Sequence, residues 1–141
     1  MSRRKARETA LQALYELEYN ERTPQAACET VLALLDMDNS VEETGYATEI
    51  VGGVQANIGE IDDIISKLSD GWEITRMPCV DRNIIRIAIF EMQYAVDKMS
   101  PGIAINEAVE LAKIFGTDET RKFVNGLLSN VVKKYSAGTA E

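Results

Sequence analysis

The first seven residues contain four basic side chains and no acidic one: Arg3, Arg4, Lys5 and Arg7. A helix predicted over residues 3–19 places them in its first turns, where unpaired backbone N–H groups already make the helix end positive. Bases there disfavour the helix, so an anionic ligand explains the cluster better than folding does. Arginine pairs with phosphate, and short arginine-rich segments order on RNA. Two interpretations remain open, an RNA-binding segment and a solvated helix end.

A second candidate site lies in residues 116–126, where Arg121 and Lys122 precede Phe123. Phe123 is about 100° around the predicted helix from the apolar stripe that starts at Val124. If accessible, its ring would stack on an unpaired base while the two cations bind phosphates, as in binders of single-stranded RNA. If it packs against another helix instead, it is an ordinary core residue. The sequence does not decide between the two.

The chain offers no candidate for catalysis. It contains no histidine, the commonest general base and metal ligand. Paired acids such as Asp62 and Asp63 have no nearby base or apolar pocket that would separate their pKa values. No glycine-rich phosphate loop and no hydrolase motif is present. Cys28 and Cys79 are too far apart for a metal or redox pair, which predicts reduced structural thiols. We therefore expect no enzyme activity, no metal site and no cofactor.

Charge is distributed unevenly along the chain. The 141 residues carry a net charge of −8, yet residues 1–7 contain only bases and residues 8–75 hold 15 acids against Arg22 and Lys67. Residues 76–141 are nearly balanced, with nine bases and eight acids. A chain polarised in this way can present a basic patch although its average is acidic. No apolar run approaches the ~20 residues of a membrane span, so we expect a cytoplasmic protein.

The elements that must position these residues are helices. Hydrophobic periodicity predicts about seven of them in an all-α fold, organised around a buried helix in residues 78–96. Gly52 and Gly53 inside the third helix indicate a close crossing with another helix. Thr23 and Thr117 are predicted N-caps, Ser40 with Glu43 has the form of a capping box, and Gly116 is placed as a C-terminal cap.

Residues 3–15, 72–91, 104–113 and 122–126 resemble, in this order, the most recognisable segments of the NusB family of bacterial transcription antitermination factors. The resemblance implies two small helical bundles packed across each other, with subdomains at about residues 1–75 and 76–141 of one RNA-binding domain. It also implies binding to single-stranded boxA RNA of ribosomal RNA leader transcripts together with NusE, a small-subunit ribosomal protein. Other Nus factors and RNA polymerase are the further partners.

The resemblance also assigns roles to individual residues. The arginine-rich motif falls on the four N-terminal bases, and Tyr15, Glu119, Lys122 and Phe123 match positions associated with RNA or antitermination. Asp81 matches an acid on the side that meets NusE. Two alternatives stay open: a NusB-like accessory domain of a ribosomal RNA cytosine methyltransferase, and a helical scaffold that binds only proteins. The sequence also leaves open whether the chain is a monomer or a homodimer.

Overall fold

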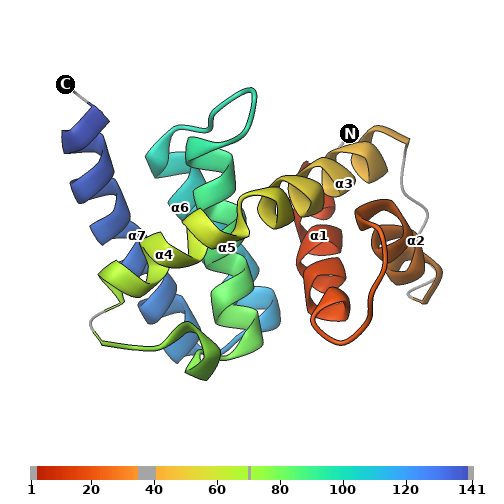
Figure 1. Ribbon diagram of the computed structural model, residues 1–141, viewed down its shortest axis with the longest axis horizontal. Coiled ribbons are helices and arrows are strands. Elements are labelled where there is room, and N and C mark those ends of the chain that lie inside the picture. The colour runs from red at the N-terminus through yellow and green to blue at the C-terminus, as the bar shows by residue number, and fades with distance from the viewer. Residues whose placement is uncertain (1–2, 35–40, 70, 140–141) are drawn as a thin grey trace.

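The computed structural model describes residues 3–34, 41–69 and 71–139, and within them the chain forms seven α-helices and one short 3-10 helix without any strand (Figure 1). The predicted all-α fold is confirmed. The elements are α1 Arg3–Leu17, α2 Pro24–Leu34, α3 Val41–Ala56, α4 Ile58–Leu68, η1 Ile74–Arg76, α5 Cys79–Gln93, α6 Pro101–Phe115 and α7 Asp118–Thr139. Among these helices, none is both long and apolar enough to cross a membrane.

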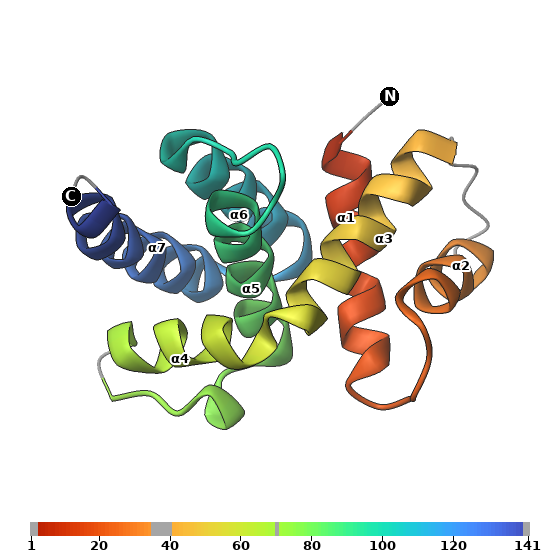
Figure 2. The ribbon, with the colours of Figure 1, turned by 45° about the horizontal axis from the view of Figure 1, so that its top comes forward.

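The helices form two groups that meet along α5. Helices α1, α2 and α3 pack on one another, and α5, α6 and α7 form the second group with α4 against α5 and α7 (Figures 1 and 2). Helices α1 and α3 both contact α5 and so join the groups. The structure thus places α4 with the C-terminal helices, whereas the sequence-based division near residue 75 assigns it to the N-terminal subdomain.

Helix α5 is buried nearly all round, as its sequence predicts. Ile84, Ile85 and Ile89 are completely inaccessible to solvent, and Phe90 is almost so. Burying a side chain of this size contributes roughly 1.5–3 kcal/mol each, which makes α5 the centre of one continuous core. Every neighbouring helix therefore takes its position from this one.

The crossing predicted from the paired glycines occurs where α3 meets α5. A Cβ atom on Gly53 would lie 2.0 Å from the ring of Phe90, a distance at which no side chain fits. Gly52 is less tightly placed, since its nearest neighbour is the Pro24 side chain at 3.8 Å. Gly53 therefore sets how closely α3 approaches the central helix, and with it how the N-terminal group docks.

Two of the predicted caps are formed as expected. The Thr23 hydroxyl accepts a hydrogen bond from the Ala26 amide at 3.1 Å, and the Thr117 hydroxyl accepts one from the Thr120 amide at 3.2 Å. Gly116 is also the C-terminal cap of α6 as predicted, with an extended φ of −124°. Glycine is needed there because a Cβ would lie 2.6 Å from the Thr120 methyl group. The capping box of Ser40 and Glu43 lies outside the described residues.

Candidate nucleic-acid interface

The N-terminal bases of α1 do not all face solvent. Arg3, Arg4 and Lys5 are exposed on the first turn, while Arg7, one turn further on, is only 5% exposed. The prediction that all four side chains contact phosphate does not fit Arg7, because its position on the helix turns it toward α5 and α6. We call the three exposed residues the basic tip.

Arg7 lies in a network of groups from three other helices. Its Nε is 2.9 and 3.0 Å from the two carboxylate oxygens of Glu91 on α5, and its Nη1 is 3.2 Å from Glu107 on α6. The hydroxyl of Tyr46 on α3 donates a short hydrogen bond to Glu91. Burial works to lower the pKa of Arg7, but the hydrogen bond and charge of Glu91 raise it, so the guanidinium stays charged. Arg7 thus anchors α1 instead of binding a ligand.

The basic tip rests on this network while staying accessible. Arg4 donates from Nε and Nη2 to the two oxygens of Glu107, at 3.2 and 2.7 Å, with half of its side chain in solvent. The guanidinium of Arg3 lies 4.3 Å from the centre of the Tyr46 ring. The hydrogen bond and charge of Arg4 hold the pKa of Glu107 below its usual value. The carboxylate is therefore ionised and offsets part of the tip's charge.

A second basic surface lies between α6 and α7. Arg121, Lys122 and Asn125 line an open groove of about 510 Å³ together with α6 residues that include Asn106. Arg121 also pairs with Asp118 at 2.8 Å, and Glu119 and Lys122 are exposed. Asn106 directly precedes Glu107 along α6, so this helix lies between the groove and the basic tip. The structure therefore brings the two predicted cationic segments to neighbouring surfaces of one helix.

Phe123 does not line that groove. Its ring is half-buried and meets the indole of Trp72 edge to face, with 6.2 Å between the ring centres and 62° between the planes. The ring packs against the core, as one of the two sequence-based interpretations expects, and it is only partly accessible. Trp72, which sequence reasoning left out of the site, is the more exposed partner.

Tyr15 lies further along α1, on the side of the helix that also carries Arg4. It is exposed and forms an edge-to-face pair with Tyr19 at 5.3 Å. Both rings line a mostly apolar groove of about 460 Å³ between α1, α2, α5 and the end of α6, with Leu34 and Phe115 across from them. An exposed apolar patch of this kind is uncommon on an isolated domain, which makes the groove a candidate surface for a protein partner.

Asp81, the predicted partner residue, is buried near the start of α5. Burial raises the pKa of its carboxyl group, and a hydrogen bond from Thr120 on α7 opposes that shift. The neighbouring Val80 lines the apolar groove. Asp81 therefore ties the start of α5 to the start of α7, directly behind the groove.

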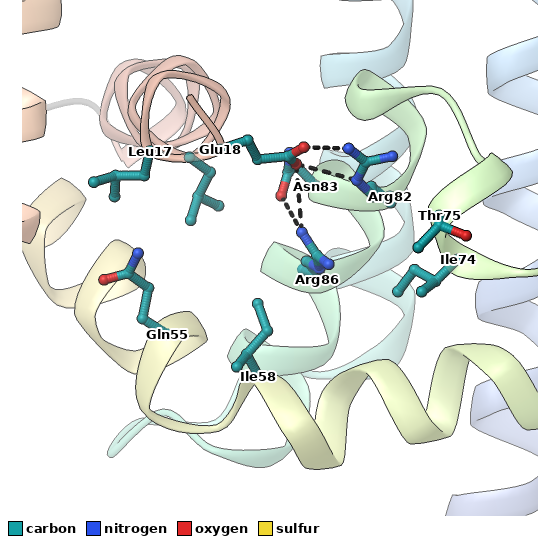
Figure 3. A pocket seen from close by; sticks show the side chains of 10 residues that line it. Leu17, Glu18, Gln55, Ile58, Ile74, Thr75, Arg82, Asn83 and Arg86 are labelled. Atoms are coloured by element: carbon teal, nitrogen blue, oxygen red, sulfur yellow. Dashed lines mark hydrogen bonds and ion pairs between the residues drawn. The ribbon is translucent and has the colours of Figure 1, made fainter. Parts of the chain in front are cut away.

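An open pocket of about 430 Å³ with a mixed polar and apolar lining lies between the two helix groups (Figure 3). Glu18 at the end of α1 accepts hydrogen bonds from Arg82 and from Asn83, and lies 3.5 Å from Arg86. Arg86 also pairs with Asp62 on α4 at 2.8 Å. Both arginines are paired with carboxylates, and these ion pairs connect the two helix groups. The pocket is therefore not a second anion site. Among the described residues, no cluster of His, Cys, Asp and Glu side chains could hold a metal.

The sequence contained one unused signal for the network around Arg7. Glu91 is the single acid in the apolar part of α5, and an ionised residue in such a run requires a partner. The sequence does not say which base supplies it, since Arg7 is 84 residues away. Glu107 and Tyr46 gave no comparable signal.

Fold and surface together define an all-helical, two-group protein that presents a cationic helix end. The NusB family model matches residues 4–133, and the chain belongs to the NusB family. The transcription antitermination protein NusB of Bdellovibrio bacteriovorus is 45% identical over 134 residues, which cover 95% of this chain and 97% of that protein. The corresponding protein of Desulforudis audaxviator is 42% identical over 95% of each chain. These names agree with the expectation that the protein is not an enzyme.

Solved structures give the same result. A complex of the antitermination factors NusB and NusE with double-stranded RNA contains a chain that is 31% identical and superposes with a TM-score of 0.81, covering 94% of this chain and 97% of that one. NusB from Aquifex aeolicus in solution is 32% identical with a TM-score of 0.82, covering 99% of this chain and 93% of that one. The resemblance read from the sequence is confirmed at the level of family and fold.

Proposed function

We propose that this protein is a cytoplasmic transcription antitermination factor that binds single-stranded boxA RNA of ribosomal RNA leader transcripts. It does so together with the ribosomal protein NusE and, with the other Nus factors, acts on elongating RNA polymerase. The basic tip is the observation that carries this proposal. The relatives that carry the name antitermination protein match this chain over nearly their whole length. This favours antitermination over a role as the accessory domain of a methyltransferase.

The tip binds RNA through charge. Arg3, Arg4 and Lys5 approach the phosphates, while Arg7 holds the start of α1 against α5 and α6. Arg121 and Lys122 line a groove along α6, the helix whose Glu107 also holds Arg4. The acidic remainder of the chain repels RNA elsewhere, so useful affinity requires a partner as well.

NusE is the partner that we assign to the apolar groove around Tyr15 and Tyr19. Exposed aromatic rings on a rigid helix are frequent anchors in protein interfaces. Asp81 lies behind the groove and fixes the position of α5 relative to α7. Helix α5 forms one side of the groove. Tyr15 lies on the tip's side of α1, so it can contact RNA at the edge of the same partner surface.

The proposal is tested by measuring RNA affinity across a salt series, with and without NusE, for the wild type and for a variant with Arg3, Arg4 and Lys5 all replaced by alanine. For single strands, the log–log slope changes by roughly 0.7 for each phosphate that the protein no longer neutralises. A matched control replaces Lys98, Lys133 and Lys134, which changes the net charge equally. We expect a weaker RNA affinity and a flatter salt slope only in the tip variant, and not in the lysine control. Equal affinities in all three proteins would refute the mechanism.

Strand preference is tested in the same assay. We expect a boxA oligoribonucleotide to bind more tightly than the same sequence paired in a duplex, because unpaired bases can stack on aromatic side chains. If the duplex competes as well as the single strand, the surface recognises only the RNA backbone. If the protein binds neither RNA, with or without NusE, the alternative of a helical scaffold that binds only proteins is correct.

A further inference from the structure

Trp72 is the only tryptophan of the chain, and 53% of it is exposed. It follows α4 in a turn in which Gly71 has a φ of +89°, a conformation that favours glycine. The Trp72 amide donates to the Ser69 carbonyl at 3.2 Å, and the buried Ser69 hydroxyl donates to the Trp72 carbonyl at 2.7 Å. The backbone that carries this exposed indole is therefore fixed on both sides.

The indole is also held from one side by Phe123. The edge-to-face contact between the two rings joins the α4–η1 segment to α7. Phe123 in turn packs against the core, so the pair has a rigid base. A large aromatic side chain that is held in this way and still half exposed loses little conformational entropy when a ligand covers it.

A cation lies beside the indole, at the end of η1. Trp72 and Arg76 line a shallow hollow of about 370 Å³ with Gly71 and Glu73. The Arg76 side chain is 78% exposed, and its ion pair with Glu73 is loose at 3.8 Å. Such an exposed pair contributes little, so a phosphate can displace the carboxylate.

We propose that Trp72 and Phe123 form a stacking site for one unpaired RNA base, with Arg76 as a contact to a neighbouring phosphate. This inference rests on the proposed RNA-binding function and adds a site whose two aromatic residues do not line the α6 groove. Aromatic rings beside cations are the common arrangement in single-strand binders, because every base has a face that can stack. Phe123 then supports the site, and Trp72 provides most of its accessible surface.

The single tryptophan makes the test specific, since its fluorescence reports this site alone. A boxA oligoribonucleotide with a fluorescein label is titrated into the full chain with NusE lacking tryptophan, and anisotropy is recorded alongside tryptophan emission. We expect emission to be quenched with the same midpoint as the anisotropy change. The variant W72A should weaken RNA binding about 5- to 150-fold, the range found for removal of one stacking side chain. W72F should retain most of the affinity.

Two controls separate the roles. V96A truncates an apolar side chain that is 91% exposed and lies outside the site, and it should bind like the wild type. R76A should flatten the salt slope by roughly 0.7 while the emission is still quenched.

RNA that binds by anisotropy without altering emission, and equally well to W72A, would overturn the stacking site and leave the proposed function standing. Failure of RNA to bind in either readout would overturn both. A shift in emission when NusE is added before any RNA would assign Trp72 to a protein interface and refute the base-stacking proposal.

Discussion

Arg7 and Glu91 form a buried ion pair between the first helix and the central helix, with both carboxylate oxygens within 3.0 Å of the Arg7 Nε. The side chains are only 6% and 3% exposed. An arginine one turn from an exposed basic cluster is thus part of the interior. The pair fixes where the basic tip lies relative to the C-terminal helices, so it links the stability of the fold to the position of the proposed RNA surface.

Removing the Arg7 side chain should destabilise the protein strongly. R7A leaves the Glu91 carboxylate buried without its main partner, and breaking a buried pair in this way costs about 3–5 kcal/mol. Urea unfolding monitored by circular dichroism measures the change in the free energy of unfolding. R4A is the control, because half of the Arg4 side chain is exposed and solvent screens its pair with Glu107, so the loss of stability should be much smaller than in R7A. Similar losses in the two variants would contradict the anchoring role of Arg7.

Glu107 should restrain RNA binding. Its carboxylate holds Arg4, so E107Q frees that guanidinium for phosphate and removes a negative charge beside the tip. We expect a roughly 2- to 5-fold higher RNA affinity, the equivalent of an exposed ion pair, and a steeper salt slope. D63N alters the net charge equally on α4 and should have little effect. A lower affinity in E107Q would instead mean that Glu107 positions Arg4 for RNA.

Sequence patterns predicted the fold because its signals are local. The apolar run of α5, the caps Thr23 and Thr117 and the glycine at the α3 crossing each depend on residues that are close along the chain. The C-terminal cap at Gly116 was also predicted correctly, but the reason for glycine there is a tertiary contact with Thr120, which the local sequence does not reveal.

The site could be predicted only in part, because its decisive contacts are long-range. Arg4 meets Glu107 across 103 residues, and no pattern in either segment names the other. The type of residue at the tip was evident from composition, whereas the division into exposed Arg4 and buried Arg7 depends on packing. Trp72 was overlooked for the same reason, since only the fold brings it against Phe123.

The close approach of α3 to α5 predicts opposite effects for two glycines. G53A introduces a methyl group that meets the Phe90 ring, and such overpacking costs typically about 1–3 kcal/mol. G59A in the exposed first turn of α4 has nothing within 4 Å and should stabilise by about 0.4–1 kcal/mol through the unfolded chain. Thermal unfolding of both variants measures the difference. Equal melting temperatures would show that α3 can move away from α5 at no cost.

Tyr46 should give the fold a specific sensitivity to alkaline pH. Burial raises the pKa of its hydroxyl to about 12, and the hydrogen bond to Glu91 acts in the same direction. An unfolded tyrosine titrates near about 10, so the folded state favours the protonated form. Its contribution to stability is therefore fully present below about pH 10, decreases as the pH rises further and is lost above about pH 12.

The measurement compares urea unfolding of the wild type and Y46F at several pH values. The difference between their free energies of unfolding should shrink by about 1–3 kcal/mol across that range, since one pKa unit corresponds to about 1.4 kcal/mol. Tyr94, whose pKa burial likewise raises to about 12, is present in both proteins and cancels in the difference. A difference that stays constant up to about pH 12 would mean that the Tyr46 hydroxyl does not hold the carboxylate of Glu91 in the folded protein.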